Sequence, residues 1–138
     1  TTLYLRANVD GGHLYLGDGH YAQGDGEIAG TAIEGAFHSS LAVAKVSDDE
    51  TFDFPRIETQ TCIGVIGVGR PLESAIKVAA AEMVRWVAAL TGLDPQDAYQ
   101  LVSQIGKLRV CNLVNPEYTA LLSVPKTILP KGTVVMGR

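Results

Sequence analysis

A short acidic and glycine-rich segment near the start of the chain holds the residues best suited to chemistry. Its members with reactive side chains are Asp18, His20, Asp25 and Glu27. In extended backbone, residues two positions apart point to the same side, which groups these side chains into two pairs. If the intervening glycines let the pairs fold together, three carboxylates and one imidazole would surround a single point. Such a mixed oxygen and nitrogen set suits Zn²⁺, whereas oxygens alone would favour Ca²⁺ or Mg²⁺.

The same residues have a simpler interpretation as the turn of a hairpin. Gly-Asp and Asp-Gly are common turn sequences, and their carboxylates would then stay in water. The charge distribution favours the metal hypothesis, because five acids and no Lys or Arg lie between Arg6 and Lys45, whereas residues 45–138 carry ten bases and ten acids. Carboxylates brought together without basic partners need a cation or shared protons. The absence of a basic patch also argues against a nucleic-acid partner.

Composition places the chain among ordinary folded domains. Its 138 residues are 46% hydrophobic and 19% charged, which is enough apolar material for a core. It has no run of 18 apolar residues and no basic-then-apolar signal pattern, so we expect a soluble, cytoplasmic protein without a membrane partner. Cys62 and Cys111 are isolated, which fits a reducing compartment better than a disulfide framework.

The hydrophobic pattern predicts an α+β fold with a β-rich sheet or sandwich. Residues 1–69 are expected to be mainly β and to carry the metal motif, and residues 70–138 to form a helix–helix–strand part with an extended tail. The expected strands are Thr2–Arg6, His13–Leu16, Ile28–Ile33, Ser40–Val46, Thr59–Val68 and Leu108–Val114.

Two helices are expected in succession in the second part. Pro71 suits the first position of a helix whose apolar residues recur at helical spacing until Gly92 stops it. Asp94 can cap a second helix that begins at Pro95 and ends at Gly106.

The stretch Gly17–Glu34 resembles the signature of the acetamidase/formamidase family. Further stretches resemble the family in the same order, namely Thr2–Leu5, Gly69–Ala75, Met83–Trp86 and Leu108–Pro116. Because members of the family are longer, the resemblance implies that this chain is the C-terminal half of a larger β-rich fold. Half of such a fold would leave strand edges and apolar faces uncovered, so we expect the N-terminal half as a partner and a homo-oligomer as the assembly.

The resemblance implies a metal-dependent amidohydrolase that cleaves short amides, such as formamide or acetamide, into ammonia and a carboxylate. Zinc is the expected metal, with calcium as the alternative. The expected metal ligands are Asp18, His20, Asp25 and Glu27. The expected catalytic residues are Glu27, which either moves protons or acts as a ligand, and Glu34, which acts from outside the ligand set. Tyr21 and Gln23 are expected to contact the substrate or, alternatively, to pack and hydrogen-bond the turns.

Two other functions are compatible with the sequence. The carboxylates could hold Ca²⁺ as a structural element of a non-catalytic β domain that binds a ligand without converting it. Alternatively, Thr1 could act as a nucleophile with its own amine as base, as in amidases made by self-cleavage.

Overall fold

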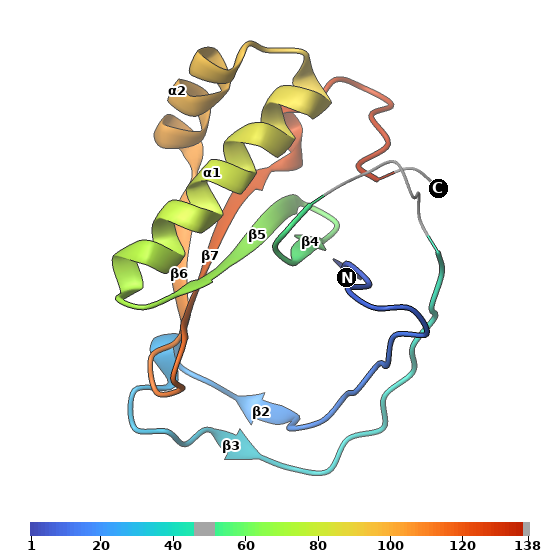
Figure 1. The fold of residues 1–138 in the computed structure, drawn as a ribbon, viewed down its shortest axis with the longest axis vertical. Helices are drawn as coiled ribbons and strands as arrows, with labels where there is room; N and C mark the ends of the chain where they lie inside the picture. The colour runs from blue at the N-terminus through green and yellow to red at the C-terminus, as the bar shows by residue number, and fades with distance from the viewer. Residues whose placement is uncertain (46–51, 137–138) are drawn as a thin grey trace.

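The fold is described for residues 1–45 and 52–136 in a computed structural model (Figure 1). Its body is an antiparallel sheet of five strands in the order β1-β4-β5-β7-β6. These strands are β1 (Thr2–Tyr4), β4 (Arg56–Glu58), β5 (Cys62–Gly69), β6 (Lys107–Asn112) and β7 (Tyr118–Pro125). Two shorter strands, β2 (His20–Ala22) and β3 (Ile33–Glu34), pair with each other apart from this sheet. Together with the two helices below, the sheet confirms the α+β prediction.

Helices α1 (Leu72–Thr91) and α2 (Pro95–Ile105) confirm the two predicted helices. The Asp94 side chain caps α2 by accepting hydrogen bonds from the backbone N–H groups of Gln96 and Asp97, at 2.8 and 3.1 Å. Gly92 ends α1 in the left-handed conformation, with φ at 74°. The sequence predicted Pro71 as the first residue of this helix; in the structure Pro71 is the N-cap, and α1 begins one residue later at Leu72.

The core lies between α1 and the sheet. The buried side chains of α1 that enter it include Met83, Trp86 and Val87, and the sheet supplies Ile63, Val65, Leu122 and Val124. Each such side chain contributes about 1.5–3 kcal/mol when fully buried. Figure 1 shows both helices on the same side of the molecule as the long strands β5, β6 and β7. Within the part of the chain that the structure describes, no helix is long and apolar enough to cross a membrane.

The strand predictions hold in the body and largely fail in the segment 5–45, which we call the arm. His13–Leu16 forms no strand, only the last residue of Ile28–Ile33 lies in one, and residues 40–45 form none. Val46, the last residue of the predicted strand Ser40–Val46, lies outside the described residues. The sequence also missed the short strands β2 and β4, and the tail that it predicted only as extended contains the long strand β7. Apart from the β2–β3 pair, the β-prone residues of the arm have no neighbouring strand among the described residues, and β propensity without a partner does not make a strand.

The arm is extended and exposes many apolar side chains. Figure 1 shows it leaving the body at β1 and returning toward β4 by a wide path that passes the outer ends of β6 and β7. There the 3₁₀ turn η1 (Asp25–Glu27) docks on β6 through the hydrogen bond from the Leu113 N–H to the Gly26 carbonyl, at 2.9 Å. The exposed apolar residues of the arm are Leu5, Val9, Leu14, Tyr15, Leu16, Tyr21, Ile28, Ile33, Phe37, Leu41 and Val43. A surface of this kind indicates a segment that packs against something else.

Candidate metal centre

His20 and Glu34 are paired residues across the two short strands β2 and β3. Tyr21 holds these strands together, because its hydroxyl donates to the carbonyl of Ala36 at 3.0 Å. Its ring also lies so close over Gly35 that a Cβ at that position would be 2.0 Å from it, so any larger residue there would displace the Tyr21 ring. The strand pairing therefore places one imidazole and one carboxylate side by side.

Glu27 reaches the same place because the η1 turn folds back against the end of β6. Gly26 makes this possible with a φ of 81°, and it is buried against Leu113. Glu27 itself has a φ of 46°, which is uncommon for a residue with a side chain and costs about 1–2 kcal/mol. The amide of Asn112 donates to the Glu27 Oε2 at 3.4 Å and so fixes that carboxylate from β6. Strain of this kind is typical of residues held in place for function.

The result is a group of three side chains that can hold a cation. One ring nitrogen of His20 and one carboxylate oxygen each of Glu27 and Glu34 lie within 4.8 Å of one another. Among the described residues, these three form the one group of acidic, histidine or cysteine side chains that lie close enough to share an ion. Ligand atoms bonded to one Zn²⁺ lie about 2.0–2.2 Å from it, so the observed spacing is close to one that a single ion can bridge. The donor set of one nitrogen and two oxygens fits such an ion.

His20 is surrounded by hydrogen-bond acceptors. Its Nδ1 lies 2.8 Å from the Gln23 Oε1, and its Nε2 lies 3.2 Å from the Asp18 Oδ1. The His20 side chain is only 13% exposed. Its pKa is raised above 6.5, first by the hydrogen bond to Gln23 and further by Asp18, while desolvation opposes the shift. Acceptors on both sides of the ring favour a positive charge at this position, whether a proton or a metal ion supplies it.

Glu34 is held in its charged form. Its Oε1 accepts the backbone N–H of Ala32 at 3.1 Å, and this hydrogen bond is the main reason why the pKa of Glu34 is lowered. A carboxylate that keeps its negative charge is a better metal ligand than one that protonates readily. The sequence placed Glu34 outside the ligand set, whereas the structure brings it to His20 and Glu27.

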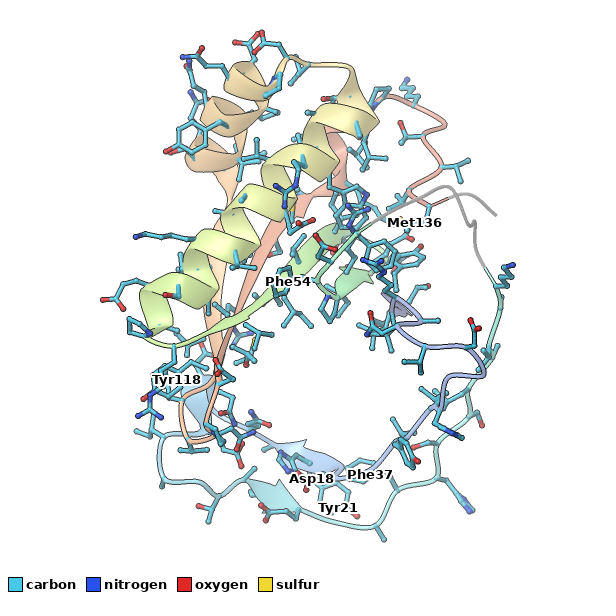
Figure 2. All side chains as sticks on the ribbon, viewed as in Figure 1. Asp18, Tyr21, Phe37, Phe54, Tyr118 and Met136 are labelled. Carbon is cyan, nitrogen blue, oxygen red and sulfur yellow. The ribbon has the colours of Figure 1, made fainter. Side chains whose placement is uncertain are left out.

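The two aspartates that the sequence assigned to the metal lie outside this group of three side chains. Figure 2 shows Asp18 beside Tyr21 and Phe37 at the β2–β3 pair, and its side chain is 82% exposed while one oxygen faces His20. Asp25 is turned away to Arg109, whose Nη2 lies 2.6 Å from Oδ1 and whose Nε lies 3.1 and 3.3 Å from the two oxygens. Asp25 is therefore not among the three residues that the fold gathers.

Of the expected substrate contacts, Tyr21 lies in β2 and Gln23 directly follows that strand. The Tyr21 hydroxyl is bonded within the hairpin, and its ring packs on Phe37 with ring centres 4.8 Å apart. Gln23 borders a cavity of about 260 Å³ that is also lined by Gly24, Asp25, Arg109, Val110, Cys111 and Leu121. Burial and the charge of Asp25 raise the pKa of the Cys111 thiol, so that group is protonated at neutral pH.

Sequence reasoning missed the contribution of β6 to the site. Arg109 binds Asp25, the Cys111 carbonyl accepts from Gln23 at 3.0 Å, and Asn112 binds Glu27, all across more than eighty residues of chain. The local pattern of β6 gives no sign of these contacts. The signal that could have found them is the resemblance of Leu108–Pro116 to the same family as the Gly17–Glu34 stretch.

The N-terminus lies elsewhere. Thr2 pairs with Glu58 of β4, and Figure 1 shows the chain start beside β4, well away from β2 and β3. The described structure thus brings Thr1 to none of the residues gathered around His20.

Comparison with known proteins gives a consistent result. A model of the acetamidase/formamidase family matches residues 1–131. The chain is similar to a crystal structure of acetamidase from Yersinia enterocolitica, with 36% identity and a TM-score of 0.82, over 94% of this chain and 39% of that one. It is also similar to an acetamidase from Bacillus halodurans, with 32% identity and a TM-score of 0.77, over 91% of this chain and 42% of that one.

A third structure shares the fold at lower identity. It is a predicted acetamidase/formamidase from Thermoanaerobacter tengcongensis, with 24% identity and a TM-score of 0.66, over 79% of this chain and 36% of that one. The chain therefore spans well under half the length of the solved structures it resembles. No curated protein matches it.

Proposed function

We propose, on the premise that this chain belongs to the acetamidase/formamidase family, that it supplies the metal-binding part of an enzyme that hydrolyses short amides. The observation that carries the proposal is the convergence of His20, Glu27 and Glu34 within 4.8 Å. Their elements come from three places, namely β2, η1 and β3, and each residue is held by hydrogen bonds or strand pairing.

The donor set supports zinc over calcium. An imidazole nitrogen with two carboxylate oxygens is a common zinc set, whereas calcium takes six to eight oxygens. Two carboxylates this close repel each other, and a divalent cation relieves that repulsion. The same requirement weakens the alternative of a calcium-stabilised binding domain, because His20 would then contribute nothing to the ion.

The residues can divide the work of hydrolysis. When bound, a zinc ion would lower the pKa of a water molecule toward about 7. We assign His20 and Glu34 as fixed ligands, because Gln23 and the Ala32 N–H hold each of them in its ligand form. Glu27 is both a ligand candidate and the group that moves the proton. It accepts the proton from the attacking water and delivers it to the amide nitrogen, so that the C–N bond breaks and ammonia leaves. Such acid–base help is worth about 10²–10⁴-fold in rate.

The cavity beside Gln23 suits a small substrate. Val110 and Leu121 give it apolar walls, and Gln23 and Arg109 give it polar ones. We propose that the acyl group of a formamide-like or acetamide-like substrate lies there. Tyr21 remains a proposed contact on the other side of the hairpin.

The exposed apolar side chains of the arm support the proposal that a partner covers them. We propose that the remaining part of the family fold covers the exposed side chains of residues 5–45, among them Tyr15 at 86% and Ile28 and Val43 at 80% exposed. We also propose a homo-oligomer and a cytoplasmic location. Expression of residues 1–138 by themselves should give a protein that binds a hydrophobic dye and unfolds without a sharp transition. A cooperative monomer of the isolated chain would contradict the need for a partner.

The function is tested by ammonia release and metal analysis of the intact protein. Incubation with formamide, acetamide and longer amides should release ammonia from the short ones first, and a chelator should stop the reaction until Zn²⁺ is restored. Active protein that contains no divalent ion would refute the mechanism. Turnover that survives the Glu27→Gln change but is lost in Thr1→Ala would instead support the N-terminal nucleophile.

A further inference from the structure

A chain of hydrogen bonds links β6 to the candidate metal ligand His20. The backbone carbonyl of Cys111 accepts from the Gln23 Nε2 at 3.0 Å. The other end of the same amide, the Gln23 Oε1, lies 2.8 Å from the His20 Nδ1. The Nε2 of His20 in turn lies 3.2 Å from the Asp18 Oδ1.

The donor and acceptor roles at the β6 end of this chain, from Cys111 to the His20 Nδ1, follow by elimination. A backbone carbonyl can only accept, so the Gln23 atom that faces Cys111 must be the NH₂ group. The Gln23 oxygen then faces His20, and because a carbonyl oxygen can only accept, the His20 Nδ1 must carry the hydrogen. In the neutral imidazole the other nitrogen, Nε2, is therefore left with its lone pair.

We propose that Gln23 is a positioning residue that holds His20 in the Nδ1–H tautomer, so that the Nε2 lone pair points at a divalent metal. The inference rests on the proposed function. Asp18 acts in the opposite sense, because its carboxylate beside Nε2 would favour the Nε2–H tautomer. Gln23 decides between the two forms because its orientation is set by β6, a strand of the folded body.

Gln23 also ties the arm to β6, and this second role predicts something different. To connect the arm to β6, Gln23 needs only its bond to the Cys111 carbonyl. To control the tautomer of His20, it needs only the oxygen that accepts from the His20 Nδ1. Gln23→Leu removes both bonds, while Gln23→Glu keeps an acceptor toward His20 and replaces the donor toward Cys111 with an oxygen. The pair of variants therefore separates the two roles.

The test uses the intact protein and two measurements. Nitrogen NMR of the histidine rings, recorded without metal at a pH where His20 is neutral, reports which ring nitrogen carries hydrogen. Calorimetric titration with Zn²⁺ reports the affinity. Gln104→Leu, an exposed glutamine on α2, is the matched control.

We expect the wild type, Gln104→Leu and Gln23→Glu to show the Nδ1–H form, and Gln23→Leu to shift to Nε2–H with Asp18 as acceptor. Loss of a hydrogen-bond partner behind a metal-binding histidine typically weakens metal affinity about 10–100-fold, so we expect that loss in Gln23→Leu and affinity near wild type in Gln23→Glu. Zn²⁺ affinity within twofold of wild type in Gln23→Leu overturns the proposal, as does an equal loss in both Gln23 variants. If the wild type binds no metal while its His20 tautomer is as expected, the proposed function and the positioning of His20 toward a metal both fail, and only the control of the tautomer by Gln23 stands.

Discussion

Replacement of Gly26 by alanine should open the η1 turn and carry Glu27 away from His20. Two costs add up. A residue with a Cβ at a φ of 81° costs about 1–2 kcal/mol in backbone conformation. The added methyl group would also lie 3.2 Å from side-chain carbons of both Ile28 and Leu113, and crowding of this kind costs about 1–3 kcal/mol.

Gly30→Ala is the matched control. Gly30 has a φ of 70° on the same arm, but a Cβ there would meet no atom within 4 Å. The control should therefore carry the backbone cost without the crowding, and the difference between the two variants is about 1–3 kcal/mol.

Hydrogen exchange of the Leu113 amide measures this opening directly, because that N–H donates to the Gly26 carbonyl only when the turn is docked. A difference of about 1.4 kcal/mol corresponds to tenfold, so protection of Leu113 should fall about tenfold further in Gly26→Ala than in Gly30→Ala. The Zn²⁺ affinity should fall in the same order. Equal Leu113 protection in the two variants would refute the account of how the turn is held.

Three further predictions concern the site itself. Glu27→Gln should lower amide turnover about 10²–10⁴-fold with substrate affinity little changed, as measured by ammonia release over a range of substrate concentrations; an active variant would remove Glu27 from proton transfer. Asp25→Asn should leave Zn²⁺ affinity within about threefold and cost at most about 1 kcal/mol of stability, because the ion pair of Asp25 with Arg109 is more than half exposed on both sides. Glu34→Gln should instead weaken Zn²⁺ binding strongly. A larger loss of affinity in Asp25→Asn than in Glu34→Gln would restore Asp25 as a ligand. Because the pKa of His20 is raised, its protonation stabilises the metal-free protein fully below about pH 6.5, and this stabilisation is lost as the pH rises through the folded-state pKa. Zn²⁺ binding requires the neutral ring, so the Zn²⁺ affinity should increase over the same pH range. An affinity that does not change with pH would exclude His20 as a ligand.

The sequence predicted best what depends on local patterns. Both helices were located by their apolar spacing, by Asp94 at one start and by Gly92 at one end, because these signals act within a turn of the chain. The β5 strand was predicted for a similar reason, since a continuous apolar run has to be buried. The arm was predicted poorly because residues such as Leu14 and Tyr15 are β-prone but lie in no strand and pair with none among the described residues.

The candidate site shows the same limit at a finer scale. The spacing of residues in the motif predicted a meeting of its side chains, and of that predicted set the structure brings His20 and Glu27 together. It could not show that Glu34 would join them, because this depends on the register of β2 against β3. Nor could it show that Asp25 would turn to Arg109, because the partner lies 84 positions further along the chain.

The contacts between β6 and the motif have a consequence for recombination between members of the family. Residues 23–27 of the arm are bound to residues 109–113 by the Asp25–Arg109 ion pair, by the bond from Gln23 to the Cys111 carbonyl, by the bond from Asn112 to Glu27, and by the backbone bond from the Leu113 N–H to Gly26. A hybrid that takes the arm from one family member and the helical body from another would keep these bonds only where both parents carry matching residues at these positions. Recombination between such genes preserves the centre only when the tip of β6 is inherited together with the motif.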